Sequence, residues 1–122
     1  MLEPVLIDTN FCIGVINGRI HPSVLDSFNL HISVISCSEL YALRGMSLKE
    51  EDDIKSFFDT CIILPVTLPI ALQAGKLSRT RPPRRLPDML IASTAIQLGL
   101  PLITDDKAFR GIPGLNVFCL KT

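Results

Sequence analysis

Carboxylates that follow apolar, strand-like segments are the residues of this sequence whose types and spacing best suit chemistry. Asp8 comes directly after the apolar segment 5–7, and Asp106 closely follows the apolar segment 102–103. Glu39 lies about one turn into the helix predicted after a strand at 30–35, and Asp88 stands at the start of the helix predicted over 89–98. In an open parallel sheet, ligands bind beyond the carboxyl ends of the strands. We therefore expect these four acids to form one cluster.

The ligand atoms of such a cluster limit its chemistry. It would contain carboxylates, with no histidine or cysteine ligand among them, and carboxylates that lie close together repel each other unless cations are bound. Oxygen-only ligation suits Mg²⁺ or Mn²⁺, whose coordination is often completed by water and substrate phosphates. Such a metal can generate a hydroxide nucleophile and stabilise a departing oxygen. The cluster therefore predicts metal-dependent hydrolysis of phosphodiester bonds.

Each acid also has a structural interpretation, which the sequence leaves open. Asp8 could cap the following helix, and Ser36-x-x-Glu39 fits a capping box in which Glu39 bonds a backbone amide. The charge of Asp88 suits the positive end of a helix dipole, and acids such as Asp106 are common in turns. The hypothesis of a metal site therefore depends on the coincidence of the four positions, since no single acid carries it.

Basic residues gather in one segment, 79–85, which we call the arginine loop. It holds four of the twelve basic side chains, while the whole chain has a formal net charge of +0. Two adjacent prolines forbid regular helix and predict an extended, exposed loop that could be a mobile binding element. We expect its arginines to bind phosphates of a nucleic acid, although a solvated loop or a contact with an acidic partner is the alternative. These arginines are Arg79, Arg81, Arg84 and Arg85.

The elements that must position these residues alternate between strands and helices. Strands are predicted over 5–7, 30–35, 62–64, 102–103 and 116–120, and helices over 11–16, from Ser36, from Ser47, over 69–77 and over 89–98. This rhythm is typical of a three-layer α/β domain with a central, mostly parallel sheet. The length of 122 residues and the absence of a linker predict a single domain over residues 1–122.

Composition narrows the cellular context. Hydrophobic residues make up 48% of the chain, yet no apolar run approaches the roughly 18 residues that a membrane span needs. The N-terminus lacks the pattern of a signal peptide, so we expect a soluble, cytoplasmic protein without membrane contact. The cysteines are widely separated among apolar residues and are interpreted as small buried hydrophobes. They are Cys12, Cys37, Cys61 and Cys119.

Several motifs resemble those of PIN domains, and specifically of VapC-like toxins of toxin–antitoxin modules, over nearly the whole chain. They are Leu6-Ile7-Asp8-Thr9-Asn10, Ser33 to Leu40 ending in Glu39-Leu40, Leu86 to Ala95, Gly99 to Asp106, and Ile112-Pro113-Gly114-Leu115 with Phe109 before it. The resemblance implies a sheet of strand order 3-2-1-4-5 and a metal-dependent endoribonuclease. One departure is visible, because many relatives have glycine where this chain has Leu43, and here Gly45 follows two positions later.

The same resemblance implies roles for individual residues. Asp8, Glu39, Asp88 and Asp106 would be catalytic, metal-binding acids that hold Mg²⁺ or Mn²⁺, with Asp105 a neighbour outside the ligand set. Thr9 and Thr104 would orient carboxylates or metal-bound water, and Asn10 would hold the strand-to-helix turn. The implied partners are an RNA substrate, a cognate antitoxin and a second copy of the chain in a homodimer.

Two other functions are compatible with parts of the pattern. The first is a PIN-like binding module that recognises a partner or RNA without turnover, which metal-dependent cleavage would exclude. The second is a phosphatase that forms an aspartyl phosphate on Asp8, but that chemistry usually has a second Asp two positions later as the acid. Asn10 occupies this place, and the sequence therefore disfavours a phosphatase.

Overall fold

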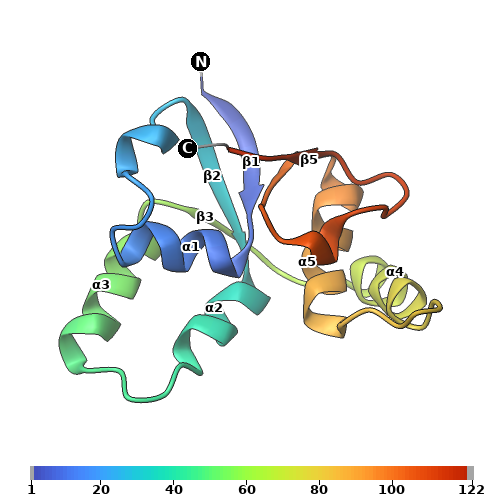
Figure 1. The fold of residues 1–122 in the computed structure, drawn as a ribbon, viewed down its shortest axis with the longest axis horizontal. Coiled ribbons are helices and arrows are strands. Elements are labelled where there is room, and N and C mark those ends of the chain that lie inside the picture. The colour runs from blue at the N-terminus through green and yellow to red at the C-terminus, as the bar shows by residue number, and fades with distance from the viewer. Residues whose placement is uncertain (1, 121–122) are drawn as a thin grey trace.

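The computed structural model describes residues 2–120, and the strands in that range form one sheet in the order β3-β2-β1-β4-β5 (Figure 1). β1 (Glu3–Ile7) is central, between β2 (Phe28–Ser33) and β4 (Leu102–Ile103). The edges are β3 (Ile62–Leu64) and β5 (Val117–Phe118), and every strand pair is parallel. The predicted α/β class and strand order are confirmed.

Helices flank both faces of this sheet. Figure 1 shows α1 (Thr9–Ile16), α2 (Val34–Tyr41) and α3 (Leu48–Phe58) on one side, and α4 (Leu68–Ser78) and α5 (Leu86–Leu98) on the other. Two short 3-10 turns, Pro22–Leu25 and Lys107–Phe109, were not expected from the sequence. Across residues 2–120, none of the helices has the length and apolar character needed to cross a membrane.

Each face of the sheet has its own hydrophobic core. Side chains alternate along a strand, so Val5 and Ile7 of β1 pack with α1, α2 and α3, while Leu6 packs with α4 and α5. The second core takes Ala74 from α4 and Met89 from α5, both fully buried. The central strand β1 therefore packs against both layers of helices, one on each face of the sheet, and both layers reach the same carboxyl edge.

Three predicted helix starts are wrong, and all three errors concern segments that carry site residues. α1 begins at Thr9, two residues earlier than predicted. α2 begins at Val34 instead of Ser36, because Ser33 is the N-cap and its Oγ accepts a hydrogen bond from Ile35 N–H at 3.1 Å. The preceding strand ends at Ser33, two residues earlier than predicted. α5 begins at Leu86, so Asp88 is the third residue of its first turn and does not start the helix.

The register of the sheet explains why the site forms at its carboxyl edge. Ile7 at the end of β1 pairs with Ile32 of β2 and with Ile103 of β4. The residues that follow these strands, Asp8 and Thr104, therefore leave the sheet side by side. The sequence brings them together through strand pairing, although they are 96 positions apart.

Candidate active site

Asp8 is the most deeply buried of the four acids, with 3% of its surface exposed. Its Oδ1 accepts a hydrogen bond from Phe11 N–H at 2.8 Å, which makes it the N-cap of α1. The Thr104 hydroxyl donates to Oδ2. The expected capping role is therefore present, but it does not exhaust the carboxylate, since each oxygen has two lone pairs.

Glu39 is held by a hydroxyl from a different helix. Thr9 Oγ1 lies 2.6 Å from Glu39 Oε1 and 2.8 Å from Ser36 Oγ. A hydroxyl has one proton and a carboxylate only accepts, so Thr9 donates to Glu39. The capping box predicted for Ser36 and Glu39 is wrong, because Ser33 caps α2 and Glu39 lies in the second turn. Sequence reasoning missed Ser36 as a partner of Thr9, although its spacing of three from Glu39 places both on one helix face.

Asp106 is tied to the same network through its backbone and its side chain. Its Oδ1 caps the 3-10 turn by accepting from Ala108 N–H at 2.9 Å, and its N–H donates to Thr104 Oγ1 at 3.0 Å. Asn10 Nδ2 lies 3.4 Å from Asp106 Oδ2. Thr104 thus bridges two acids, because its hydroxyl donates to Asp8 while its oxygen accepts from Asp106.

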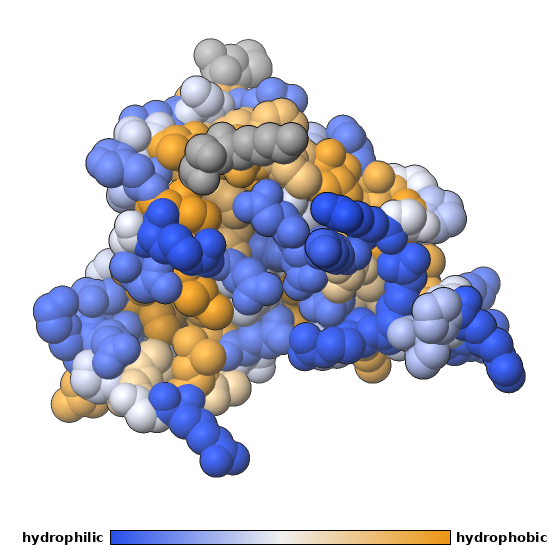
Figure 2. All heavy atoms as spheres, viewed as in Figure 1, coloured by the Kyte–Doolittle hydropathy of each residue, from blue (hydrophilic) through white to orange (hydrophobic). Residues whose placement is uncertain are grey.

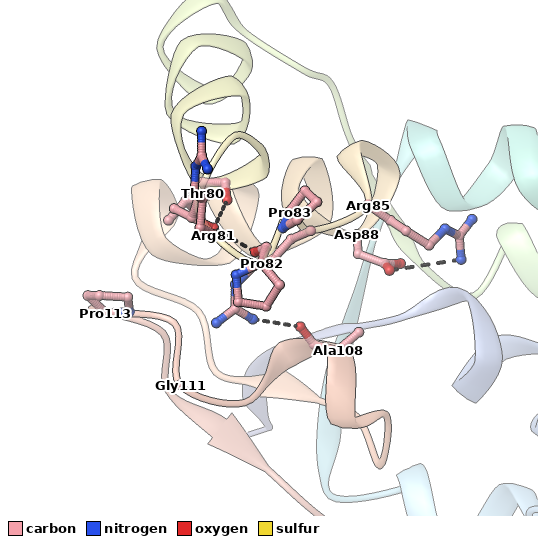
Figure 3. A pocket seen from close by; sticks show the side chains of 11 residues that line it. Thr80, Arg81, Pro82, Pro83, Arg85, Asp88, Ala108, Gly111 and Pro113 are labelled. Atoms are coloured by element: carbon pink, nitrogen blue, oxygen red, sulfur yellow. Dashed lines mark hydrogen bonds and ion pairs between the residues drawn. The ribbon is translucent and has the colours of Figure 1, made fainter.

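Asp88 and Glu39 share a cation from the arginine loop. Arg85 Nη1 lies 3.9 Å from Asp88 Oδ2, and Arg85 Nη2 lies 4.0 Å from Glu39 Oε2. Figure 3 shows the Arg85 side chain extending alongside Asp88. Arg85 was predicted as an RNA contact, and the structure places it as a counterion between acids of α2 and α5. Sequence reasoning missed this role, because it depends on how those two helices pack.

Electrostatic repulsion connects the four acids. Burial raises the pKa of Asp8, the hydrogen bonds from Thr104 and Phe11 oppose this, and the charges of Asp106 and Asp88 raise it further. Burial likewise raises the pKa of Asp88, against the lowering effect of Arg85, and the charges of Asp106 and Glu39 add to the rise. A cation bound at this edge of the sheet would offset the repulsion among the acids and so lower the pKa of both Asp8 and Asp88.

The donor chemistry fits a hard divalent cation, although the carboxylates stand apart. Within residues 2–120, no group of three His, Cys, Asp or Glu side chains is arranged to hold a metal ion as it stands. Asp8 and Asp106 line one cavity of about 370 Å³, while Glu39 and Asp88 line separate hollows. Carboxylate oxygens are nevertheless the ligands that Mg²⁺ and Mn²⁺ prefer. The set of acids therefore fits such a metal by its chemistry and by its mutual repulsion.

The arginine loop is anchored at its base. Arg84 N–H donates to Ser78 O at 3.0 Å, and Ser78 Oγ donates to Arg84 O at 2.6 Å. The Arg84 Nη1 group donates to Ala108 O and to Arg110 O, both at 3.1 Å. Arg79, Arg81 and Arg85 are exposed, as predicted, whereas Arg84 is half-buried and holds the loop against the segment 108–110. Figure 2 shows strongly hydrophilic side chains over this part of the molecule.

A mostly apolar hollow of about 500 Å³, which we call the apolar hollow, lies between α1, α2 and α3. Its walls include Ile13, Ile16, Leu40, Met46 and Ile54, together with the polar or charged Asn17, Arg44, Glu50 and Asp53. Leu43, which replaces the glycine of many relatives, also lines it and is 46% exposed. Figure 2 shows hydrophobic side chains at the surface in this region.

Several solved structures that resemble this fold are toxin–antitoxin complexes. A chain in the structure of VapBC2 from Rickettsia felis bound to a promoter DNA fragment has a TM-score of 0.82 at 22% identity, covering 98% of this chain and 100% of that chain. For DNA-bound VapBC from Salmonella typhimurium the TM-score is 0.77 at 26% identity, with 98% of each chain covered. For a toxin–antitoxin complex from Klebsiella pneumoniae it is 0.75 at 29% identity, with 91% and 94% covered.

Comparison by sequence gives the family. No curated protein matches this chain, whereas the family model of the PIN domain matches residues 5–115. That range includes all four acids, both threonines, Asn10 and the arginine loop. The resemblance noted in the sequence is confirmed, and the chain belongs to the PIN-domain family.

Proposed function

We propose that this protein is a metal-dependent endoribonuclease and the toxin of a toxin–antitoxin pair. The observation that carries the proposal is the set of four acids at one carboxyl edge, where charge repulsion and burial raise the pKa of Asp8 and Asp88. Membership of the PIN-domain family supports it, as do solved neighbours that are VapBC and toxin–antitoxin complexes.

In this proposal Asp8, Glu39, Asp88 and Asp106 hold Mg²⁺ or Mn²⁺. When bound, the metal lowers the pKa of a water and stabilises the charge that develops on the departing oxygen of a phosphodiester. The protein's own part is to orient the ligands. Thr104 fixes Asp8 relative to Asp106, Thr9 fixes Glu39, and Asn10 supports Asp106 across the turn after β1.

The arginine loop supplies positive charge for the RNA in this proposal. Arg79, Arg81 and Arg85 present exposed guanidinium groups beside the site, and Arg84 keeps the loop in place. Contacts of this kind bind phosphates without reading sequence and weaken as salt rises. The loop therefore contributes affinity, and the acids contribute the chemistry.

A cognate antitoxin is the proposed protein partner, because the similar solved structures are toxin–antitoxin complexes. The exposed apolar hollow between α1, α2 and α3 supports a protein partner of some kind, since such patches mark interaction sites. A homodimer, a single domain over residues 1–122 and a cytoplasmic location complete the proposal, and the resemblance to VapC-like toxins supports each of them.

The test is cleavage of a labelled RNA pool by the purified protein in Mg²⁺, in Mn²⁺ or in EDTA. We expect the protein to cut RNA only when a metal is present. The cleavage rate should fall about 100-fold or more in Asp8→Asn and Asp88→Asn, because loss of a residue that merely positions a metal ligand already costs about 10–100-fold. The matched control is Asp52→Asn, which removes the same charge from an exposed residue of α3 outside the site and should cut like the wild type.

Two outcomes would contradict the nuclease. One is cutting that persists in EDTA or in the Asp8→Asn protein, which points to a contaminating enzyme. The other is a folded wild type that binds Mn²⁺ and leaves every RNA in the pool intact. The second outcome would favour a PIN-like binding module.

A further inference from the structure

A second cavity, of about 480 Å³, lies beside the acids between the arginine loop and the segment 108–113 (Figure 3). Its volume lies within the range of about 300–1,000 Å³ that is typical of small-ligand sites. Asp88, one of the four acids, forms part of its wall. The cavity therefore adjoins the proposed catalytic edge at Asp88.

The charge of this cavity fits an anion. Arg81, Arg84 and Arg85 line it, against the single carboxylate of Asp88. Arg85 is partly neutralised by Asp88 and Glu39, but within residues 2–120 neither Arg81 nor Arg84 has a carboxylate within 4.0 Å. Two bonds to backbone carbonyls hold the Arg84 guanidinium in place without reducing its charge. A guanidinium fixed in this way binds a phosphate with little loss of side-chain entropy.

The remaining walls are flat and apolar. Pro82 and Pro83 form one side and Pro113 lies on the other, as Figure 3 shows. Proline has no N–H, so these walls cannot pair with an extended peptide in the manner of a strand. The face of a nucleobase can instead pack on the proline rings and stack on an arginine guanidinium, which needs no sequence preference.

We propose that this cavity binds one nucleotide of a single-stranded RNA, next to the nucleotide whose phosphodiester is cut. The phosphate lies against Arg81 and Arg84, and the base lies against the proline walls. This inference rests on the proposed ribonuclease function and adds a substrate subsite to it. The arginine loop then places the strand for cleavage in addition to attracting it.

The experiment measures binding of a short labelled RNA that spans a site cut by the wild type, using the Asp8→Asn background to prevent turnover. Arg81→Ala should weaken binding about 10-fold, since a hydrogen bond to a charged group is worth about 1.5–3 kcal/mol and 1.4 kcal/mol is tenfold. The salt slope should fall by about 0.7, the value for one phosphate on a single strand. Arg79→Ala removes the same charge from the loop outside the cavity and should lose less.

A distant arginine provides the matched control. Arg44 is exposed and lines the apolar hollow between α1, α2 and α3. Arg44→Ala lowers the net charge of the protein as Arg81→Ala does, yet it should change RNA affinity less than about 2-fold, because exposed charges more than about 10 Å apart are screened at 0.1 M salt. Equal effects of Arg44→Ala and Arg81→Ala would overturn the cavity proposal.

A double-mutant cycle that combines Arg81→Ala with a modified RNA locates the phosphate that Arg81 contacts. A methylphosphonate removes the charge of one phosphate. At one position beside the cut, this change should abolish the difference in affinity between the protein that retains Arg81 and the Arg81→Ala variant. An abasic nucleotide at that position should also weaken binding. Additive effects at every position would refute the subsite.

Failure of the subsite and failure of the ribonuclease look different. If the wild type neither cuts nor binds any RNA, the proposed function fails. If the wild type cuts RNA and Arg81→Ala leaves RNA affinity unchanged, the nuclease stands and the subsite falls. If Arg81→Ala weakens binding of a polyglutamate peptide and leaves RNA binding unchanged, the cavity is a protein-docking site and the nucleotide proposal is overturned.

Discussion

Two threonine hydroxyls determine how the carboxylates at this site are oriented. Thr104 donates to Asp8 and accepts from the backbone of Asp106, and Thr9 donates to Glu39. Neither threonine adds charge, so each acts through the acid that it holds. Partners of this kind fix the direction of a ligand oxygen and are commonly worth about 10–100-fold in metal affinity or activity.

We predict that Thr9→Val lowers RNA cleavage by about 10–100-fold, because valine keeps the shape of threonine and removes the donor to Glu39. Thr9→Ser restores the hydroxyl and should recover most of the activity. Binding of Mn²⁺, followed by its electron paramagnetic resonance, should weaken in Thr9→Val and recover in Thr9→Ser. A Thr9→Val protein with wild-type Mn²⁺ affinity would show that the 2.6 Å contact has no positioning role.

At the scale of elements, α2 carries Glu39 to the site and its start is fixed by Ser33. This serine is fully buried at the end of β2, and its Oγ caps the helix. α3 has a similar cap in Ser47, with a complete capping box to Glu50, but α3 carries none of the four acids. Loss of either cap should destabilise its helix, but only loss of the Ser33 cap should also displace a residue of the site.

We expect Ser33→Ala and Ser47→Ala each to lower the free energy of unfolding by about 1 kcal/mol, the usual worth of an N-cap. Only Ser33→Ala should also reduce cleavage under conditions where both proteins are folded. Urea unfolding and cleavage rates measured side by side provide the check. Equal cleavage by the two variants would mean that α2 does not need its cap to place Glu39.

Local patterns predicted the strands and the α/β class, whereas the strand order came from the resemblance to PIN domains. The placement of the four acids near one edge followed from the rule that ligands bind beyond the carboxyl ends of parallel strands. Local patterns placed the start of α2 at Ser36 instead of Ser33, and local preference could not correct this because both serines are good capping residues. The Arg85 contact with Glu39 and Asp88 was also beyond reach, because it joins α2 to α5. Such contacts depend on packing between distant segments.

At the scale of the whole molecule, the acids lie at the seam between two hydrophobic cores. Asp8 follows the strand that serves both cores, Glu39 belongs to a helix of the first, and Asp88 to a helix of the second. Repulsion among these acids therefore acts across the seam and opposes the packing on either side. If the acids hold a metal as proposed, the fold gives up stability at this seam until the cation binds.

This repulsion predicts a pH dependence for the metal-free protein. The pKa values of Asp8 and Asp88 are raised in the folded state, whereas the pKa of Asp in an unfolded chain is about 3.9. The folded state therefore holds these protons to higher pH, and the free energy of unfolding falls as pH rises from about 4 through the folded pKa values. Each unit of pKa difference corresponds to about 1.4 kcal/mol.

Urea unfolding in EDTA between pH 4 and pH 8 measures this dependence. Asp8→Asn should lose less stability than the wild type across the window, whereas Asp52→Asn, in α3 and outside the cluster of acids, should follow the wild type. Saturating Mg²⁺ should offset the loss, by about 2.7 kcal/mol at 100 times its Kd. Parallel pH curves for the wild type and Asp8→Asn would mean that the charge of Asp8 costs the fold nothing.

The double hydrogen bond between Ser78 and Arg84 also bears on how this protein can diversify. It closes the arginine loop at its base, so the residues at the tip do not determine where α5 begins or where Asp88 lies. Loops closed in this way tolerate changes of sequence and length at low thermodynamic cost. Segment 79–83 can therefore change in sequence and length. Such changes would alter how tightly the loop holds RNA phosphates, while the acids at the carboxyl edge of the sheet keep their places.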